Sequence, residues 1–232
     1  MESLPSTNTY AWNLIDKGKE SGIILTSNQY DGKGQRNNNW LSSIEGGITF
    51  SLFLNRKLPS NQLGILPILA GLSIQEAMLN HAITVSLKWP NDIYHSGEKL
   101  AGILIENNIY KGNQLVLIGV GVNFQLVDKH DIETSWVDLS RILTKLPSFQ
   151  KLTAAIINNI LMLSEDFQLN GLTRLLSQWD HYDMLKGVRI KLRESNIEFE
   201  GQIDGISEQG ALKVITKDGV KELYSSMHIE YI

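Results

Sequence analysis

Residues 115–123 limit the fold most strictly, because they combine the pattern of a strand with glycines inside that strand. Side chains alternate along a strand, and one face here carries branched apolar residues: Val116, Ile118, Val120 and Val122. The other face carries Gly119, Gly121 and Asn123, so it is almost bare backbone ending in an amide. A glycine inside a strand marks a bulge, tight packing against a helix, or the close approach of a ligand. The segment predicts a sheet with a core on one face and a close contact on the other.

The neighbouring segments predict a sheet with flanking helices in irregular order. Strand patterns cover the stretches 22–27, 48–54, 84–88, 93–95 and 99–106. The spacing of apolar residues predicts a first helix that is capped by Ser6 or Thr7 and ends at Gly18 or Gly22. It predicts further helices over 67–82, 138–144 and 153–179. Because strands and helices do not alternate regularly, the expected fold class is α+β.

From residue 187 onward the pattern changes to short strands separated by turns. These strands are expected over 188–192, 197–206, 211–216, 220–224 and 228–232. We therefore expect one domain over residues 1–184 and a small β domain over residues 185–232. A domain of fewer than about 50 residues buries little surface by itself, so it is expected to depend on its neighbour for stability.

Composition restricts the environment and the partners of the chain. It has no cysteine, which excludes disulfides and thiolate metal sites and fits a reducing compartment. No signal-peptide pattern and no apolar run of about 20 residues is present, so we expect a soluble, cytoplasmic protein without a membrane anchor. The net charge of −4 argues against broad binding to DNA.

The stretch 88–99 carries the first candidate chemistry. Pro90 restricts Trp89 to extended geometry, which makes a stiff corner between two strands. Lys88, Asp92 and Lys99 flank this corner, and two cations with one carboxylate can converge on an anion. The alternative is a solvated surface hairpin with an Asp–Lys pair, favoured about two to one for an isolated pair. A tryptophan exposed on such a loop is costly without a partner, which weighs against that alternative.

Two other segments combine polar side chains in a suggestive order. Ser6, Thr7 and Asn8 are ordinary helix-capping residues, and the same groups can also bind a ureido or amide group. The loop 31–40 contains glycines and cations, but it lacks the spacing of a phosphate-binding P-loop. The histidines show no metal-binding spacing, no carboxylate cluster suggests a built-in metal site, and a nucleophilic serine elbow is absent.

Taken together and in order, these segments resemble the biotin protein ligase family. The matching segments are 6–8, Gln29 with 32–34 and Trp40, 88–92, 99–106 and 118–123. The most specific feature is Lys-Trp-Pro-Asn-Asp, seven residues before Lys-Leu-Ala-Gly-Ile-Leu-Ile-Glu and followed by Ile-Gly-Val-Gly-Val-Asn. The likeness continues through Gly-Ile-Ser-Glu-Gln-Gly-Ala-Leu at 205–212, so it covers essentially the whole chain.

The resemblance implies both a fold and a reaction. The fold would be a mixed sheet with flanking helices, related to class II aminoacyl-tRNA synthetases, followed by a small SH3-like barrel. The reaction would activate biotin with ATP and Mg²⁺ to biotinyl-5′-AMP, and then transfer biotin to a lysine of a biotin carboxyl carrier protein. No prosthetic group is implied, a homodimer is allowed, and a winged DNA-binding domain is not expected before residue 6. Alternatives are a lipoate or octanoate ligase or transferase of the same superfamily, and a biotin-binding sensor without turnover.

The resemblance also implies three sets of site residues. The catalytic set is Lys88, Asp92 and Lys99. The biotin-binding set is Ser6, Thr7, Asn8, Gln29, Gly32, Lys33, Lys99, Gly102, Leu104, Gly119 and Gly121. The set that binds ATP or the adenylate is Lys33, Gln35, Arg36, Trp40, Lys88, Asn91 and Asn123.

Individual roles follow by position in the family's motifs. Lys99 would contact the biotin carboxylate and the adenylate phosphate, and Asp92 would orient or deprotonate the acceptor lysine. Lys88 and Asn91 would lie on the phosphates and Mg²⁺. The glycines of residues 118–123 would leave room for the ligand.

The loop 31–40 would form a flap over the ligand, and it departs from the family pattern. Trp40 would pack on adenine, and Asn123 would bond the edge of the same base. Lys33, Gln35 and Asn37 stand where many members have an arginine, a second arginine and a glycine. Lys33 keeps a charge without the bidentate fork of arginine, and Gln35 keeps only hydrogen-bonding capacity. Asn37 is expected to tolerate left-handed backbone in place of that glycine.

Overall fold

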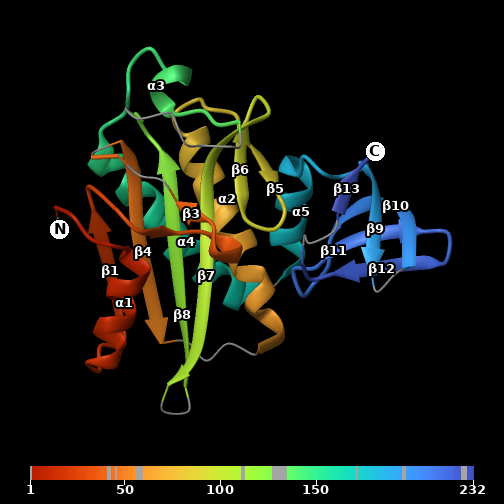
Figure 1. Cartoon of the computed structure of the whole chain (residues 1–232), viewed down its shortest axis with the longest axis horizontal. Coiled ribbons are helices and arrows are strands. Elements are labelled where there is room, and N and C mark those ends of the chain that lie inside the picture. Colours follow the sequence, from red (N-terminus) through yellow and green to blue (C-terminus); the bar gives the residue numbers. More distant parts are fainter. Residues whose placement is uncertain are drawn as a thin grey trace.

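The computed structural model describes residues 2–40, 43–44, 46–55, 60–110, 113–126, 135–170, 172–194, 197–225 and 229–232. Its largest element is a six-stranded sheet with the order β1-β4-β8-β7-β6-β5 (Figure 1). The bounds in that order are Ser21–Thr26, Gly47–Asn55, Asn113–Asn123, Glu98–Tyr110, Asp92–His95 and Ser86–Lys88. Neighbouring strands pair antiparallel, and every strand expected from residues 22–123 is found.

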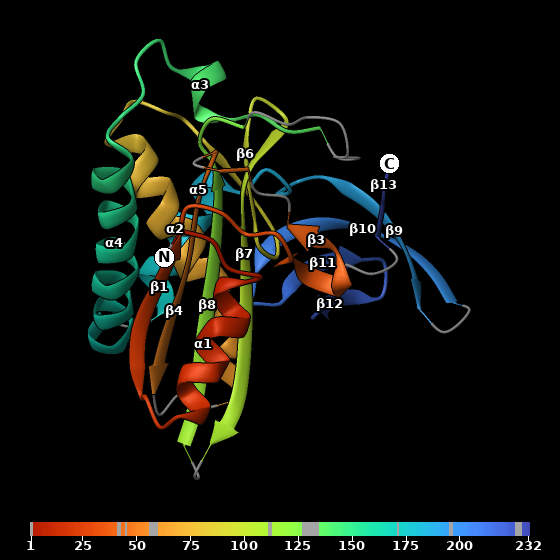
Figure 2. The same ribbon diagram turned by 60° about the vertical axis from the view of Figure 1, so that its left-hand side comes forward.

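Helices cover both faces of this sheet (Figure 2). On one face lies α1 (Thr7–Asp16), capped by Ser6 as expected, whose hydroxyl accepts from Thr9 N at 3.4 Å. On the other face lie α2 (Leu66–Leu79), α4 (Phe149–Asn170) and α5 (Leu172–Tyr182). The short helices η2 (Ser60–Ile65) and α3 (Leu139–Ile142) precede two of these.

The alternation along β4 explains why the sheet needs helices on both sides. Ile48, Phe50 and Leu52 are buried in the large core beneath α2 and α4. Phe53 points the opposite way, into the small core beneath α1. One prediction is wrong here: the expected helix over residues 153–179 is two helices, α4 and α5.

The C-terminal part forms a five-stranded antiparallel sheet of the SH3-like kind, in the order β12-β11-β10-β9-β13. The bounds in that order are Gly219–Leu223, Leu212–Thr216, Ile197–Ile206, Arg189–Glu194 and Ile229–Tyr231. The expected α+β class with a small β module is confirmed, while the boundary at residue 184 stays a prediction. Trp89 links the two parts, because its Nε1 donates to Gly210 O at 2.9 Å and its side chain is buried.

The loop 31–40 has more structure than the sequence pattern indicates. It holds the paired strands β2 (Gly32–Lys33) and β3 (Asn39–Trp40), with the 3-10 helix η1 (Gln35–Asn37) between them. The left-handed residue is Arg36, with φ 58° and ψ 36°, and not Asn37 as expected. The side chain of Asn37 lies outside the described residues. Within the described residues, no helix is long and apolar enough to cross a membrane.

Candidate active site

The strand register brings small and polar residues into one row across the sheet. Thr49 on β4 pairs with Gly121 on β8, and Gly121 pairs with Gly102 on β7. Gly102 pairs with Asp92 on β6, which in turn pairs with Lys88 on β5. Because paired residues share a face, the row runs from a hydroxyl through two glycines to a carboxylate and a cation.

A second row lies beside the first on the same face. Ser51 on β4 pairs with Gly119 on β8, and Gly119 pairs with Leu104 on β7. The two rows together form a floor with few bulky side chains. Large apolar residues of the same strands, such as Ile118 and Val122, point into the core on the other side.

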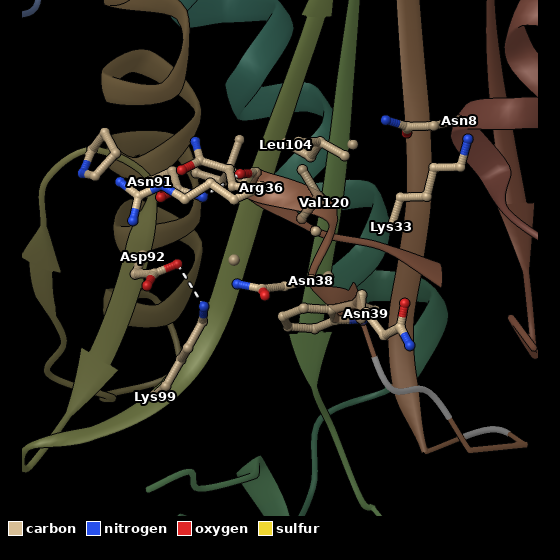
Figure 3. A pocket seen from close by; sticks show the side chains of 18 of the residues that line it. Asn8, Lys33, Arg36, Asn38, Asn39, Asn91, Asp92, Lys99, Leu104 and Val120 are labelled. Carbon is tan, nitrogen blue, oxygen red and sulfur yellow. Dashed lines mark hydrogen bonds and ion pairs between the residues drawn. The ribbon is translucent and has the colours of Figure 1, made fainter. Parts of the chain in front are cut away.

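A cavity of about 290 Å³ opens above this floor (Figure 3). Its walls come from the start of α1, the loop 31–40, the β5–β6 corner and the C-terminal strand β13. Most of the predicted site residues line it: Ser6, Thr7, Asn8, Gln29, Lys33, Gln35, Arg36, Trp40, Lys88, Asn91, Asp92, Lys99, Gly102, Leu104, Gly119 and Gly121. Segments far apart in the sequence thus meet at one cavity.

Two predicted residues do not line the cavity. Gly32 lies next to it, and a Cβ at Gly32 would meet Trp40 O at 2.3 Å, so this position excludes a side chain. Asn123 is buried, and its Nδ2 donates to Lys99 O at 3.2 Å and to Val137 O at 3.0 Å. The amide of Asn123 therefore fixes the backbone beside Lys99, and its expected contact with adenine stays a prediction.

The floor glycines accommodate side chains of the protein itself. A Cβ at Gly119 would lie 2.5 Å from Asn8 Oδ1, and a Cβ at Gly121 would lie 2.3 Å from Trp40 Cε2. The indole of Trp40 also covers Gly102, and its ring centroid is 5.9 Å from Lys99 Nζ. Of the explanations left open for these glycines, tight packing within the protein is the one found, against Asn8 of α1 and Trp40, and their role as room for a ligand stays a prediction.

A chain of oxygen atoms forms the polar end of the cavity. Gln29 Oε1 accepts from Thr7 N at 2.6 Å and lies 2.9 Å from Thr7 Oγ1. Ser51 Oγ lies 2.7 Å from Thr7 Oγ1 and 2.5 Å from Asn8 Oδ1. These three oxygen–oxygen contacts share only the two hydroxyl hydrogens of Thr7 and Ser51. The chain is one hydrogen short, so it favours a ligand group that donates.

Glu106 fixes the orientation of Asn8 within this chain. A carboxylate only accepts hydrogen bonds, so Asn8 must donate to it through Nδ2, which it does at 2.7 Å. Trp12 Nε1 lies 3.4 Å from the same carboxylate oxygen. Asn8 Oδ1 therefore faces Ser51 and the floor.

Sequence reasoning missed Ser51, Thr49 and Glu106. Thr49 and Ser51 could have been found on the polar face of the strand 48–54. Glu106 could have been found as the last residue of the motif 99–106.

The opposite end of the cavity carries the charged groups. Lys99 Nζ and Asp92 Oδ1 form an ion pair at 2.7 Å, and both side chains are about a quarter exposed (Figure 3). The ammonium of Lys99 is the partner of Asp92 Oδ1, and within the described residues the second oxygen of this carboxylate, Oδ2, has no donor. The backbone of Lys99 is held between Ser135 O and Val137 N at 3.0 Å each. The carboxylate can therefore accept a further donor.

Asn91 is fixed at the corner next to Asp92. Its Nδ2 donates to Ile103 O at 2.6 Å, and its own carbonyl accepts from Ile103 N at 3.0 Å. The remaining side-chain oxygen of Asn91 is the acceptor left for a ligand or a metal ion. Within the described residues, no group of three or more His, Cys, Asp or Glu side chains could hold a metal ion.

Tyr231 lines the cavity, and the rings of both Tyr231 and Tyr94 lie near the ammonium of Lys88. Burial raises the pKa of Tyr94 to about 12, with a further contribution from the negative charge of Asp92. Burial and Asp92 also raise the pKa of Tyr231. Both phenols stay neutral at physiological pH. Tyr231 and Ile229, which also lines the cavity, were not predicted as site residues.

Comparison with known protein families gives two matches. The Biotin/lipoate A/B protein ligase family matches residues 1–123, and the Biotin protein ligase C terminal domain matches residues 186–226. The Bifunctional ligase/repressor BirA of Bacillus subtilis is 28% identical over 230 residues, covering 96% of this chain and 70% of that protein. The protein of the same name from Escherichia coli is 30% identical over 222 residues, covering 94% of this chain and 68% of that protein.

Solved structures agree with these matches. Biotin protein ligase from Aquifex aeolicus, in complex with biotin and ATP, superposes with a TM-score of 0.83 at 27% identity. The match covers 100% of this chain and 97% of that one. The chain therefore belongs to the biotin/lipoate A/B protein ligase family, and the relatives it resembles throughout its length are biotin protein ligases.

Proposed function

We propose that the protein is a biotin protein ligase that activates biotin with ATP and transfers it to a lysine of a biotin carboxyl carrier protein. The observation that carries this proposal is that one cavity has both a polar end, whose oxygen atoms lack one hydrogen for their contacts, and a charged end. A cyclic urea offers N–H donors to the first end. The carboxylate of biotin and the phosphates of ATP are anions that the charged end can bind. The structure of the relative from Aquifex aeolicus in complex with biotin and ATP supports the same pair of substrates.

In the first step, the biotin carboxylate attacks the α-phosphorus of ATP, a P–O bond forms, and pyrophosphate leaves. A carboxylate with a pKa between about 4 and 5 is already ionised, so the step needs no general base. It needs cations where negative charge gathers. Lys99 and Lys88 line the charged end and are the residues we assign to this role.

The Lys99–Asp92 ion pair suggests how the first step prepares the second. An adenylate phosphate next to Lys99 competes with Asp92 for the ammonium. Release of Lys99 leaves the carboxylate of Asp92 uncompensated at the edge of the cavity. The incoming acceptor lysine is a cation, so it then meets an unpaired anion.

In the second step, the amine of the acceptor lysine attacks the acyl carbon, a C–N bond forms, and AMP leaves. The amine must lose its proton before it attacks, because a free lysine with a pKa near 10.4 is almost entirely charged at pH 7. We assign Asp92 to orient this ammonium and accept the proton, because its carboxylate lines the charged end of the cavity and is uncompensated once Lys99 turns to the phosphate.

Magnesium fits this site only as a partner of the nucleotide. Mg²⁺ keeps several waters and is usually held by one or two protein oxygens together with phosphates. The side-chain oxygen of Asn91 is available for this, because Nδ2 already donates to Ile103 O. When bound with ATP, the ion would offset phosphate charge, and Asn91 would hold its position beside Lys88.

The direct test incubates the protein with biotin, MgATP and a carrier domain and measures the mass of the carrier. We expect one biotinyl group per carrier and one pyrophosphate released. A carrier in which the acceptor lysine is replaced by arginine is the control. No biotinylation of several carriers that a known ligase modifies would contradict the proposal.

Two further experiments distinguish a biotin protein ligase from a lipoate or octanoate enzyme and from a biotin sensor without turnover. Lipoate or octanoate in excess should leave biotin transfer unchanged, and their transfer to a lipoyl domain would indicate the other branch of the superfamily. A sensor without turnover would bind biotin and release no pyrophosphate when ATP is added.

A further inference from the structure

Lys88 lies between two aromatic rings at the charged end of the cavity. Its Nζ is 5.3 Å from the ring centroid of Tyr94 and 5.1 Å from that of Tyr231. Both distances fall within the roughly 6 Å at which a cation is attracted to the face of an aromatic ring. Tyr94 belongs to β6, next to the corner at residues 88–92, whereas Tyr231 belongs to β13 of the C-terminal sheet.

The two lysines of the cavity are held in different ways. Lys99 is paired with Asp92 at 2.7 Å, so a carboxylate offsets its charge before any ligand arrives. Among the residues that the structure describes, no carboxylate forms an ion pair with Lys88. An aromatic face attracts a cation without cancelling its charge. Lys88 is therefore held in place with its full charge available to an anion.

The placement of Tyr231 makes this arrangement depend on the C-terminal sheet. Tyr231 pairs with Ile190, and Ile229 pairs with Leu192, so β13 is hydrogen-bonded to β9. Both Ile229 and Tyr231 line the cavity. Tyr231 is 45% exposed, so it contributes little to the core of its own sheet.

On the basis of the proposed function, we infer that Tyr231 is a positioning residue that holds Lys88 for the phosphates of ATP. The C-terminal β module thereby sets the position of a cation in the active site. Tyr94 and Tyr231 together form an aromatic clamp on Lys88, and the neutral phenol of Tyr94 adds no negative charge beside the ammonium.

The test removes the ring of Tyr231 and leaves a branched apolar side chain in its place. Tyr231→Leu removes the π face, and Tyr231→Phe keeps it and removes only the hydroxyl. In biotin-dependent pyrophosphate exchange, we expect Tyr231→Leu to raise the KM for MgATP about five- to tenfold. Tyr231→Phe should stay within about twofold of the original protein, and the Kd for biotin alone should be unchanged in both variants.

Phe199→Leu is the matched control, because Phe199 covers Lys221 at 3.7 Å in the same C-terminal module but does not line the cavity. This variant removes a contact of the same kind and should leave the KM for MgATP unchanged. An equal rise in Phe199→Leu would indicate general loosening of the module and overturn the inference. So would an unchanged KM in Tyr231→Leu, or an equal rise in Tyr231→Phe.

A second measurement does not depend on activity. In protein labelled with ¹³C-lysine, the Cε–Hε signal of Lys88, identified with Lys88→Arg, should be shifted upfield by the two rings. The shift should shrink in Tyr231→Leu and persist in Tyr231→Phe. If the original protein releases no pyrophosphate, the proposed function fails while this signal still tests the clamp. An unshifted signal in the original protein would overturn the clamp by itself.

Discussion

At the scale of single residues, Ser51 is central to the polar end of the cavity. It is fully buried on β4, and its hydroxyl bridges Thr7 Oγ1 and Asn8 Oδ1. Loss of this hydroxyl removes one of the two hydrogens in the chain and leaves Asn8 Oδ1 without its donor, and a buried acceptor without a partner costs about 1–3 kcal/mol. Ser51 thus controls the geometry of residues that a ligand would touch.

We expect Ser51→Ala to raise the Kd for biotin about tenfold, which corresponds to about 1.4 kcal/mol. Isothermal titration calorimetry gives this value. Ser73→Ala is the control, because Ser73 is equally buried and its hydroxyl donates to Leu69 O within α2, away from the cavity. Both variants should unfold more easily than the original protein, but only Ser51→Ala should bind biotin more weakly. Equal affinities in the two variants would contradict the role of Ser51.

Asp92 offers a test of the second chemical step. Asp92→Asn should slow transfer from preformed biotinyl-5′-AMP to the carrier at least about 100-fold, since the base that receives the proton is gone. Hydrolysis of the same adenylate should slow much less, because water does not carry the ammonium charge. Asp204→Asn is the control, since it also removes a carboxylate paired with a lysine, at 3.4 Å from Lys213. Equal slowing of transfer and hydrolysis in Asp92→Asn would argue against a role directed at the acceptor.

The raised pKa of Tyr94 predicts that the stability of the protein depends on pH. Its pKa is raised from 10.0 to about 12 in the folded protein, so folding favours the neutral phenol. The stabilisation is complete below pH 10 and is lost as the pH rises toward 12. Between these limits, the free energy of unfolding should fall less in Tyr94→Phe than in the original protein, by about 2–3 kcal/mol. Urea denaturation across this range measures the difference, and Tyr30→Phe, at an exposed position, should behave like the original.

At the scale of elements, a glycine in the strand β8 and a glycine in the helix α2 differ in how much space a side chain would have. Gly121 on β8 lies directly under the Trp40 indole, and a Cβ there would be 2.3–2.6 Å from three atoms of the ring. Gly71 in α2 has ordinary contacts, with the nearest atom, Trp179 Cζ3, at 3.5 Å. The Trp40 indole therefore leaves no room for a side chain at Gly121, whereas a methyl group fits at Gly71.

We expect Gly121→Ala to displace the Trp40 indole and weaken nucleotide binding about tenfold. Because Trp40 lies on a short surface hairpin and can move, stability should change by less than about 1 kcal/mol. Gly71→Ala should leave nucleotide binding unchanged and raise stability by up to about 1 kcal/mol, since glycine weakens a helix interior. Calorimetry with ATP and thermal unfolding check both. Unaltered nucleotide affinity in Gly121→Ala would mean that the position of the indole does not matter for binding.

At the scale of the whole molecule, the corner at residues 88–92 joins the two sheets. The indole nitrogen of Trp89 donates to Gly210 O, and a Cβ at Gly64 would lie 2.2 Å from Gln209 O. The same corner carries Lys88 and Asp92. Docking of the C-terminal module and placement of the charged groups are therefore coupled.

Trp89→Phe should leave Gly210 O without its donor and destabilise the protein by about 1–3 kcal/mol. We expect faster cleavage by a protease near residues 183–189 than in the original protein, measured by mass spectrometry of the fragments. Trp12→Phe makes the same chemical change on α1, and it should leave the rate of that cleavage unaltered. Equal cleavage rates in Trp89→Phe and the original protein would show that this hydrogen bond does not hold the module.

Sequence alone determined the strands, most of the helices and the α+β class, because these follow from the local spacing of apolar residues, caps and turns. It also determined most of the residues that line the cavity, because ordered motifs carry them. Tertiary structure decided what lies against those motifs: Trp40 over Gly121, Ser51 between Thr7 and Asn8, and Tyr231 over Lys88. Such contacts depend on strand register and on packing between distant segments, and no local pattern records either. For the same reason, the break between α4 and α5 and the left-handed Arg36 appeared only in the folded chain.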